Sequence, residues 1–277
     1  MKNVAFWSIA ILITVSTAYY QRFTGPTYSV SGKIQVGQSE IKYSLDRSHE
    51  TPQDYEVAIQ AESADITGYL IYRRYKSPDP WTKVPMNRKN NLLRASLPHQ
   101  PPAGKLAYKI VLISGNRETS LTGEHPVIIR FKGHVPTALI IPHIIIMFAG
   151  MLISTRGGIE ALRPEKNPQQ YAVWTTALLF IGGLILGPLV QKFAFGQFWT
   201  GFPLGSDLTD TKILIALMGW IIALTAGRRG RSPRFWILGA SILLLIVYLI
   251  PHSLMGSELD YSKMDIPPSN QTISQPK

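Results

Sequence analysis

The sequence contains no cysteine among its 277 residues. Disulfide bonds, thiolate metal sites and covalent attachment of haem through a CxxCH motif are therefore excluded for this chain. Motifs of nucleophilic and phosphate chemistry are missing too. There is no G-x-S-x-G elbow, and the stretch GRRGRSP (227–233) lacks the lysine of a phosphate-binding loop. The missing motifs favour a protein that is not an enzyme.

Charged residues are scarce in the second half of the chain. Residues 135–255 consist mostly of apolar blocks, whereas residues 21–134 are mixed and polar. The net charge of +11 would suit a nucleic-acid partner, but seven basic residues of the second half fall in two short connections between apolar runs: Arg156, Arg163, Lys166, Arg228, Arg229, Arg231 and Arg234. Such clusters set membrane topology by the positive-inside rule. We therefore expect a membrane protein with no nucleic-acid partner.

Four apolar runs make up a predicted all-α transmembrane domain over residues 135–255. They cover roughly 136–155, 171–190, 212–227 and 235–251, close to the length that a ~30 Å hydrocarbon core requires. If the basic connections are cytoplasmic, the loop 191–211 and the C-terminus lie outside the cytoplasm, as do residues 24–134. The expected location is the cell (plasma or inner) membrane, as a multi-pass protein surrounded by bilayer lipid.

The first apolar run, VAFWSIAILITVSTAYY (4–20), allows two interpretations. Ser16 and Ala18 are small enough for a signal peptide that is cut after Ala18. The aromatic residues at 19–20 suit an interfacial belt and favour a retained anchor over residues 1–23. Under either interpretation, the segment that follows is exported.

Residues 24–134 predict a β-sandwich of immunoglobulin or fibronectin type III kind. Short runs such as YEVAIQA, GYLIYRRY and LAYKIVLI alternate or are β-branched, and breakers such as SPDP separate them. The stretch YRRYKSPDPWTKVPM resembles a type III module, with Trp81 and Tyr108 as expected core aromatics. Such modules are typically spacers or binding platforms, so the resemblance implies a protein partner at this domain.

Two histidines are predicted to reach the outer face of the membrane domain. Both occur in the same tripeptide, as Ile141-Pro142-His143 and Ile250-Pro251-His252. Pro142 begins or kinks its span, and Pro251 ends the last one. Each histidine is either an interfacial or hydrogen-bonded structural residue, or part of a shared ligand site. Ionisable groups at bilayer depth are costly and often functional.

The loop FGQFWTGFPLGSDLTDTK (195–212) lies between these histidines in the sequence and on the same predicted face. A structural interpretation covers most of it. Phe198 and Trp199 belong to an aromatic belt, Asp207 or Asp210 caps the following helix, and Lys212 reaches the interface.

The same loop is also similar to the tryptophan-rich loop of the haem-handling membrane proteins of cytochrome c maturation. The similarity is carried by GQFWTGFPLGSDLTDTKILIALMGWIIAL (196–224), with Phe198 and Trp199 in the aromatic part and Asp207 or Asp210 in the acidic part. It implies that His143 and His252 are axial ligands of haem iron. It also implies that Phe198, Trp199, Asp207 and Asp210 take part in binding the haem. Without CxxCH, the haem would be of b type.

A metal ion is a second hypothesis for the outer face, with Asp207, Asp210 and Glu258 adding oxygen ligands to the two histidines. It would allow a metal-dependent outer-face hydrolase, although no HExxH spacing is present. The tail, residues 256–277, is expected to lie at the outer face and to be largely disordered, because it becomes rich in Pro, Ser and Gln. The leading hypothesis is a non-enzymatic envelope subunit or assembly factor, and a haem-binding or haem-handling protein is the alternative.

Overall fold

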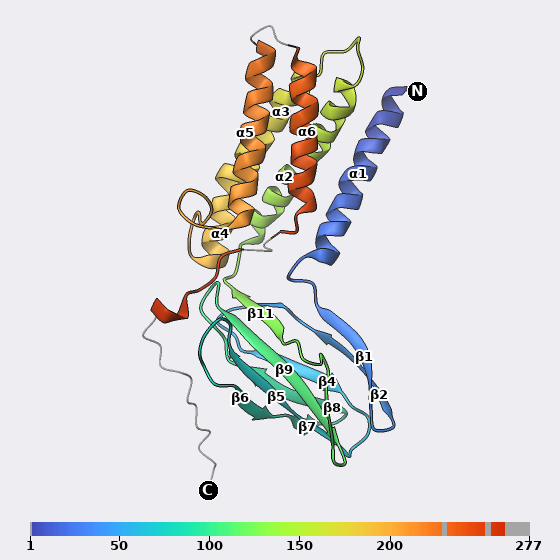
Figure 1. Cartoon of the computed structure of the whole chain (residues 1–277), viewed down its shortest axis with the longest axis vertical. Helices are drawn as coiled ribbons and strands as arrows, with labels where there is room; N and C mark the ends of the chain where they lie inside the picture. The colour runs from blue at the N-terminus through green and yellow to red at the C-terminus, as the bar shows by residue number, and fades with distance from the viewer. Residues whose placement is uncertain (1, 229–231, 253–255, 264–277) are drawn as a thin grey trace. The chain divides into compact units, whose positions relative to one another are not determined.

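The computed structural model describes residues 2–228, 232–252 and 256–263 (Figure 1). The chain divides into two compact units. The helical unit comprises Met1–Tyr28 and Gly133–Ser257, and the β unit comprises Ser29–Lys132 and Glu258–Lys277. The predicted combination of β-sheets with long apolar helices is therefore confirmed.

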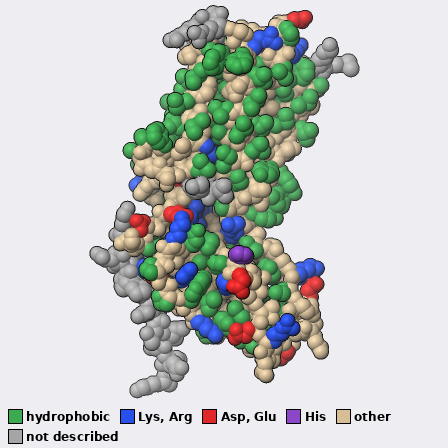
Figure 2. Space-filling model, in the orientation of Figure 1, with side chains coloured by type: hydrophobic (Ala, Val, Ile, Leu, Met, Phe, Trp, Pro, Cys, Tyr) green, Lys and Arg blue, Asp and Glu red, His purple; other side chains and the backbone are tan. Residues whose placement is uncertain are grey.

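Four helical segments of the helical unit are long and apolar enough to cross a membrane: Asn3–Thr24, Thr137–Ala161, Gln169–Phe195 and Leu208–Ala226. A further apolar helix is shorter. On the face shown in Figure 2, hydrophobic side chains cover most of this unit. The helices are α1 (Lys2–Thr24), α2 (Thr137–Ala161), α3 (Gln169–Leu179), the π-helix η1 (Phe180–Leu186), α4 (Gly187–Phe195), α5 (Leu208–Arg228) and α6 (Pro233–Leu249).

The segment α3–η1–α4 crosses the unit as one rod with a π-helical middle. Its glycines allow close packing of neighbouring helices: a Cβ on Gly182 would lie 2.7 Å from Met147 Sδ of α2, and one on Gly183 would lie 2.7 Å from Ile213 Cγ1 of α5. The rod ends at Gly196, which has the left-handed φ of 84° that favours glycine after a helix. The predicted loop 191–211 therefore shortens to the segment between α4 and α5.

The β unit contains three sheets. The largest has the strand order β3-β11-β9-β5-β6, with β10 paired to β9; β4-β8-β7 form the second, and β1-β2 a hairpin. Only β3 and β11 pair in parallel among the described pairs. The strands are β1 (Val30–Val36), β2 (Ser39–Leu45), β3 (Ser48–Glu50), β4 (Tyr55–Gln60), β5 (Ile66–Arg74), β6 (Thr82–Pro85), β7 (Asn87–Lys89), β8 (Leu92–Leu97), β9 (Lys105–Ser114), β10 (Arg117–Ser120) and β11 (Val127–Lys132).

One hydrophobic core joins the three sheets of the β unit. Tyr108 of β9 is fully buried in it, as predicted, and its hydroxyl donates to the carbonyl oxygen of Asp46 at 2.9 Å. The prediction for Trp81 is wrong. This side chain is 38% exposed and lies under the guanidinium of Arg73, 4.7 Å from Cζ to the ring centroid. Trp81 follows the SPDP breaker and precedes β6, so no strand directs it into the core.

The first part of the tail is structured. Tyr261–Lys263 form a short 3-10 turn, η2, which belongs to the β unit. The predicted disorder of residues 264–277 lies outside the described residues, as do Arg229 and Arg231 of the basic connection.

Candidate functional site in the helical unit

A cavity of about 350 Å³ lies within the helical unit. Residues of α1, α2, η1, α4, α5 and α6 contribute to the wall, most of which is apolar, and the main polar groups are His143, Asp207, Asp210, Lys212, Tyr248 and His252. Ligand pockets in proteins span ~300–1,000 Å³, so this cavity suits a small molecule or one part of a larger one.

The two histidines of the repeated Ile-Pro-His tripeptide both line this cavity. His143 is half-buried on α2, and its Nδ1 lies 3.0 Å from the carbonyl oxygen of Gly182 in η1. Because a carbonyl oxygen only accepts hydrogen bonds, Nδ1 must carry the proton, and in the neutral ring the lone pair is on Nε2. His252 follows α6 and is exposed. His143 is therefore held in one tautomer by the π-helix.

The two aspartates are buried and serve the backbone of the loop. Asp207 is the N-cap of α5, because its Oδ1 accepts from the N–H of Thr209 at 2.7 Å. Its Oδ2 accepts from the N–H and hydroxyl of Ser257 at 2.8 and 3.0 Å. Oδ2 of Asp210 accepts from the N–H groups of Thr200 and Gly201 at 2.7 and 3.0 Å. Both residues line the cavity while they fold the loop, as the structural interpretation expects.

The aromatic residues Phe198 and Trp199 do not line the cavity. Phe198 is 53% exposed, and Lys192 Nζ lies 5.3 Å from its ring centroid. Trp199 is half-buried and donates from Nε1 to the carbonyl oxygen of Phe202 at 3.1 Å. Phe202 is also exposed. The structure thus brings the histidines and aspartates together and leaves the aromatic part of the loop on the surface.

Lys212 is a member of the site that sequence reasoning missed. Lys212 is 7% exposed, and its Nζ donates to the carbonyl oxygen of Ile250 at 2.7 Å. Nearby, Tyr248 donates its hydroxyl to the carbonyl oxygen of Met147 at 2.7 Å, and Gln21 of α1 donates to the carbonyl oxygen of Tyr248. The sequence signal was a lysine within the first turns of an apolar helix, two residues after Asp210.

A second polar cluster of the helical unit is built around Arg156, which is 2% exposed on α2. Its guanidinium pairs with Glu160 at 2.5 Å and donates to Asn3 Oδ1 of α1 at 2.8 Å. Arg163 lies 3.3 Å from the same Glu160. The N-terminal end of α1 is therefore tied to the second half of α2.

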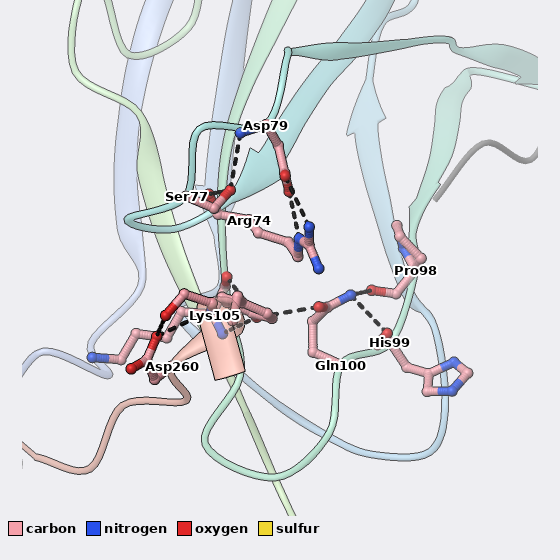
Figure 3. A network of polar contacts seen from close by, with 10 residues as sticks. Arg74, Ser77, Asp79, Pro98, His99, Gln100, Lys105 and Asp260 are labelled. Carbon is pink, nitrogen blue, oxygen red and sulfur yellow. Dashed lines mark hydrogen bonds and ion pairs between the residues drawn. The ribbon is translucent and has the colours of Figure 1, made fainter. Parts of the chain in front are cut away.

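A third polar cluster lies in the β unit, where the start of the tail packs (Figure 3). Glu258 pairs with Lys76 and Lys105, each at 2.6 Å. The hydroxyl of Tyr261 accepts from the N–H of Lys105 at 2.9 Å, and Arg74 stacks on its ring with Cζ 5.1 Å from the centroid. These contacts fix the first residues of the tail to the β unit.

The pKa values in this cluster follow from burial and pairing. Burial raises the pKa of Glu258, but the hydrogen bonds from Lys105 and Lys76 outweigh it, so the pKa lies below its usual value. Burial, together with the charge of Arg130, lowers the pKa of Lys105 although its pairing with Glu258 opposes this. Burial raises the pKa of Tyr261 to about 12.

The metal hypothesis gains no ligand set from this arrangement. Within residues 2–228, 232–252 and 256–263, no three His, Asp or Glu side chains gather as metal ligands. Glu258, which that hypothesis needs, belongs to the β unit and is ion-paired there with two lysines.

Comparison of the chain with protein-family models, with curated proteins and with solved structures finds no match. Function must therefore be argued from the residues themselves.

Proposed function

We propose that this chain is a multi-pass protein of the cell (plasma or inner) membrane that presents a β-sandwich outside the cytoplasm. In this proposal it is a non-enzymatic envelope subunit or assembly factor. The observation that carries the proposal is the position of the points at which the chain leaves and enters the helical unit.

The chain leaves the helical unit after Tyr28 and after Ser257, and it enters again at Gly133. Hydrogen bonds near these points join the last turns of α1, α4 and α6 and the start of α5 to neighbouring segments. Gln21 donates to the carbonyl oxygen of Tyr248, the N–H of Ser257 donates to Asp207, and the N–H of Gly133 donates to the carbonyl oxygen of Ala194 at 2.8 Å. The opposite helix ends include Arg156, Arg163, Lys166 and Arg234. By the positive-inside rule the basic ends face the cytoplasm, so the segments that leave the other ends are outside.

The contacts of α1 support a retained anchor. Ala10, Thr14 and Thr17 are buried on one face of this helix, and Asn3 receives a hydrogen bond from Arg156. Small residues at such a spacing let membrane helices approach closely. Cleavage after Ala18 would remove these contacts and leave Arg156 with fewer partners.

The β unit supports a binding or spacer role. Its sheets share one core, as expected for a sandwich of immunoglobulin or type III kind, and such folds bind partners through exposed faces and loops. Asp207 and Asp210 of the helical unit direct their oxygens to backbone N–H groups. Carboxylates used in this way stabilise a loop, which favours a non-enzymatic protein.

Labelling of single introduced cysteines tests the proposed orientation, because the native chain has none. Exposed positions are Thr67 in the β unit, Ser206 in the loop and Asn167 near the basic helix ends. A membrane-impermeant maleimide should label Thr67→Cys and Ser206→Cys on intact spheroplasts, and Asn167→Cys only after permeabilisation. The reverse pattern would refute the orientation.

Photocrosslinking tests the proposed protein partner. A photoreactive residue at Thr67 of β5 should give discrete heavier species in native membranes. A photoreactive residue at Trp81, just before β6, gives a second position on this sheet. If neither position yields a crosslinked species, the result contradicts a partner at this sheet.

A b-type haem protein is the second candidate, and the geometry of His143 favours it. Histidines that bind metals commonly donate their other ring N–H to a backbone carbonyl, as Nδ1 of His143 does to Gly182. His143 and His252 would hold the haem iron, with Nε2 of His143 as one ligand atom. Phe198 and Trp199 do not fit the stacking role that the resemblance implies, because they lie outside the cavity.

The visible absorption spectrum of the purified chain tests this candidate, before and after addition of haem and dithionite. The haem hypothesis predicts a Soret band that is lost in His143→Ala and in His252→Ala. His134→Ala is the matched control, because His134 is exposed and outside the cavity. A flat spectrum rejects haem and leaves the envelope function untouched.

A further inference from the structure

Lys212 carries a buried charge with little compensation. Its ammonium group has three N–H donors. Its Nζ donates to the neutral carbonyl oxygen of Ile250, and none of the ion pairs found among the described residues includes Lys212. A buried charge with so few partners is costly unless an opposite charge approaches it.

The two acidic residues of the cavity form no ion pair with Lys212, although the charge of Asp207 acts on it. Asp207 directs both oxygens to Thr209, Ser257 and Thr200, and Asp210 accepts from Thr200 and Gly201. Lys212 lines the same cavity as these carboxylates without an ion pair to either. Lys212 therefore lines the cavity as a buried cation without an ion pair among the described residues.

The rest of the cavity defines the body of a matching ligand. Ile140, Ile144, Met147, Phe148 and Val247 contribute apolar wall. Ile144 is 44% exposed although it lines the cavity, so the cavity opens at the outer surface of the helices beside α2. In a membrane, this opening gives access from the bilayer.

We propose that this cavity binds an amphiphile whose anionic oxygen head group pairs with Lys212 and whose acyl chain lies along the apolar wall of α2. The head group is a carboxylate or a phosphate. The ammonium group of Lys212 would pair with the anionic head, and the open apolar wall would take a chain that enters from the bilayer. The proposal depends neither on the orientation in the membrane nor on haem.

A displacement assay tests this proposal. The full chain is placed in nanodiscs of zwitterionic lipid and loaded with the fluorescent fatty acid cis-parinaric acid. Oleate should displace the probe, whereas oleyl alcohol, with an equal chain and no charge, should compete about tenfold more weakly or worse, which corresponds to ~1.4 kcal/mol. Acetate and inorganic phosphate test the head alone and should not compete. Monooleoyl phosphate distinguishes a preference for phosphate from one for carboxylate.

Two substitutions make the test specific. Lys212→Met should weaken oleate binding about tenfold or more, and Lys212→Arg, which keeps the charge, should restore most of it. Lys192→Met is the matched control, because Lys192 is exposed on α4 and outside the cavity. Equal binding of oleate and oleyl alcohol, or equal affinity in Lys212→Met and in the native chain, would overturn the proposal. If Lys212→Met misfolds, the comparison of oleate with oleyl alcohol in the native chain decides whether the charge of the head group matters.

Discussion

The carboxylate of Asp207 accepts two hydrogen bonds from Ser257, at 2.8 Å from the backbone N–H and 3.0 Å from the hydroxyl. The same side chain caps α5 through Thr209. One buried carboxylate thus fixes the start of a helix and a segment 50 positions later in the chain.

Asp207→Ala should lower the stability of the helical unit. The lost cap costs about 1 kcal/mol, and each N–H or hydroxyl left without its acceptor costs about 1–3 kcal/mol where it stays buried. Thermal unfolding of the purified protein in detergent measures the effect. Ser206→Ala, at the exposed neighbouring position, is the control. A melting temperature equal to that of the control would show that the loop does not depend on this carboxylate.

Acid should release the start of the tail from the β unit. The pKa of Glu258 is lowered in the folded protein, so its pairing contributes stability at pH above the unfolded pKa and loses it as pH falls through the folded pKa. The protection factors of residues 258–263 in hydrogen–deuterium exchange, which compare the observed rate with the intrinsic rate at the same pH, should therefore be high at neutral pH and lower at about pH 3–4. In Glu258→Gln the protection factors should be lower at neutral pH and change less with pH. Protection factors of the tail that are equally high in both proteins at every pH would refute the role of this ion pair.

The regular strands were predictable, whereas the short ones were not. The sequence predicts strands β1, β4, β5, β8, β9 and β11, because each coincides with an alternating or β-branched run. The hairpin strand β2, SEIKYSL, was missed because polar residues dominate it, although Ile41 and Leu45 are buried. Strands of three or four residues, such as β7 and β10, form because a neighbouring strand supplies their partners. Their sequences carry no local signal.

The site was predictable where it depends on helix order and not where it depends on packing. The repeated Ile-Pro-His tripeptide placed His143 and His252 at equivalent helix ends, and both line one cavity. The capping of α5 by Asp207 followed from residue type alone. The burial of Lys212 did not, because its partner is a carbonyl oxygen at the end of α6. Nor could the sequence show that η1 holds the His143 ring.

Arg156→Met should strongly destabilise the helical unit. Removing one partner of a buried ion pair typically costs about 3–5 kcal/mol. Glu160 keeps Arg163 as a partner at 3.3 Å, so we expect a loss at the lower end of this range. The double variant Arg156→Met/Glu160→Gln should recover a large part of this loss. Unfolding in mixed micelles of increasing SDS content measures all three proteins. Lys166→Met, at an exposed position near the same helix ends, is the control. A double variant as unstable as the single one would argue against the ion pair as the cause.

Gly183→Ala should destabilise the contact between η1 and α5. The added Cβ would lie 2.7 Å from Ile213 Cγ1, closer than real side chains come, so Ile213 or the helix must move. Overpacking of this kind costs about 1–3 kcal/mol. Gly239→Ala on α6 is the matched control, because nothing lies within 4 Å of its Cβ position and alanine is the better helix former. Combining Gly183→Ala with Ile213→Ala removes the clashing atom, so the two substitutions together should cost less than the sum of their separate effects in the same SDS titration. Strict additivity would mean that the packing of the π-helix against α5 does not limit the residue at position 183.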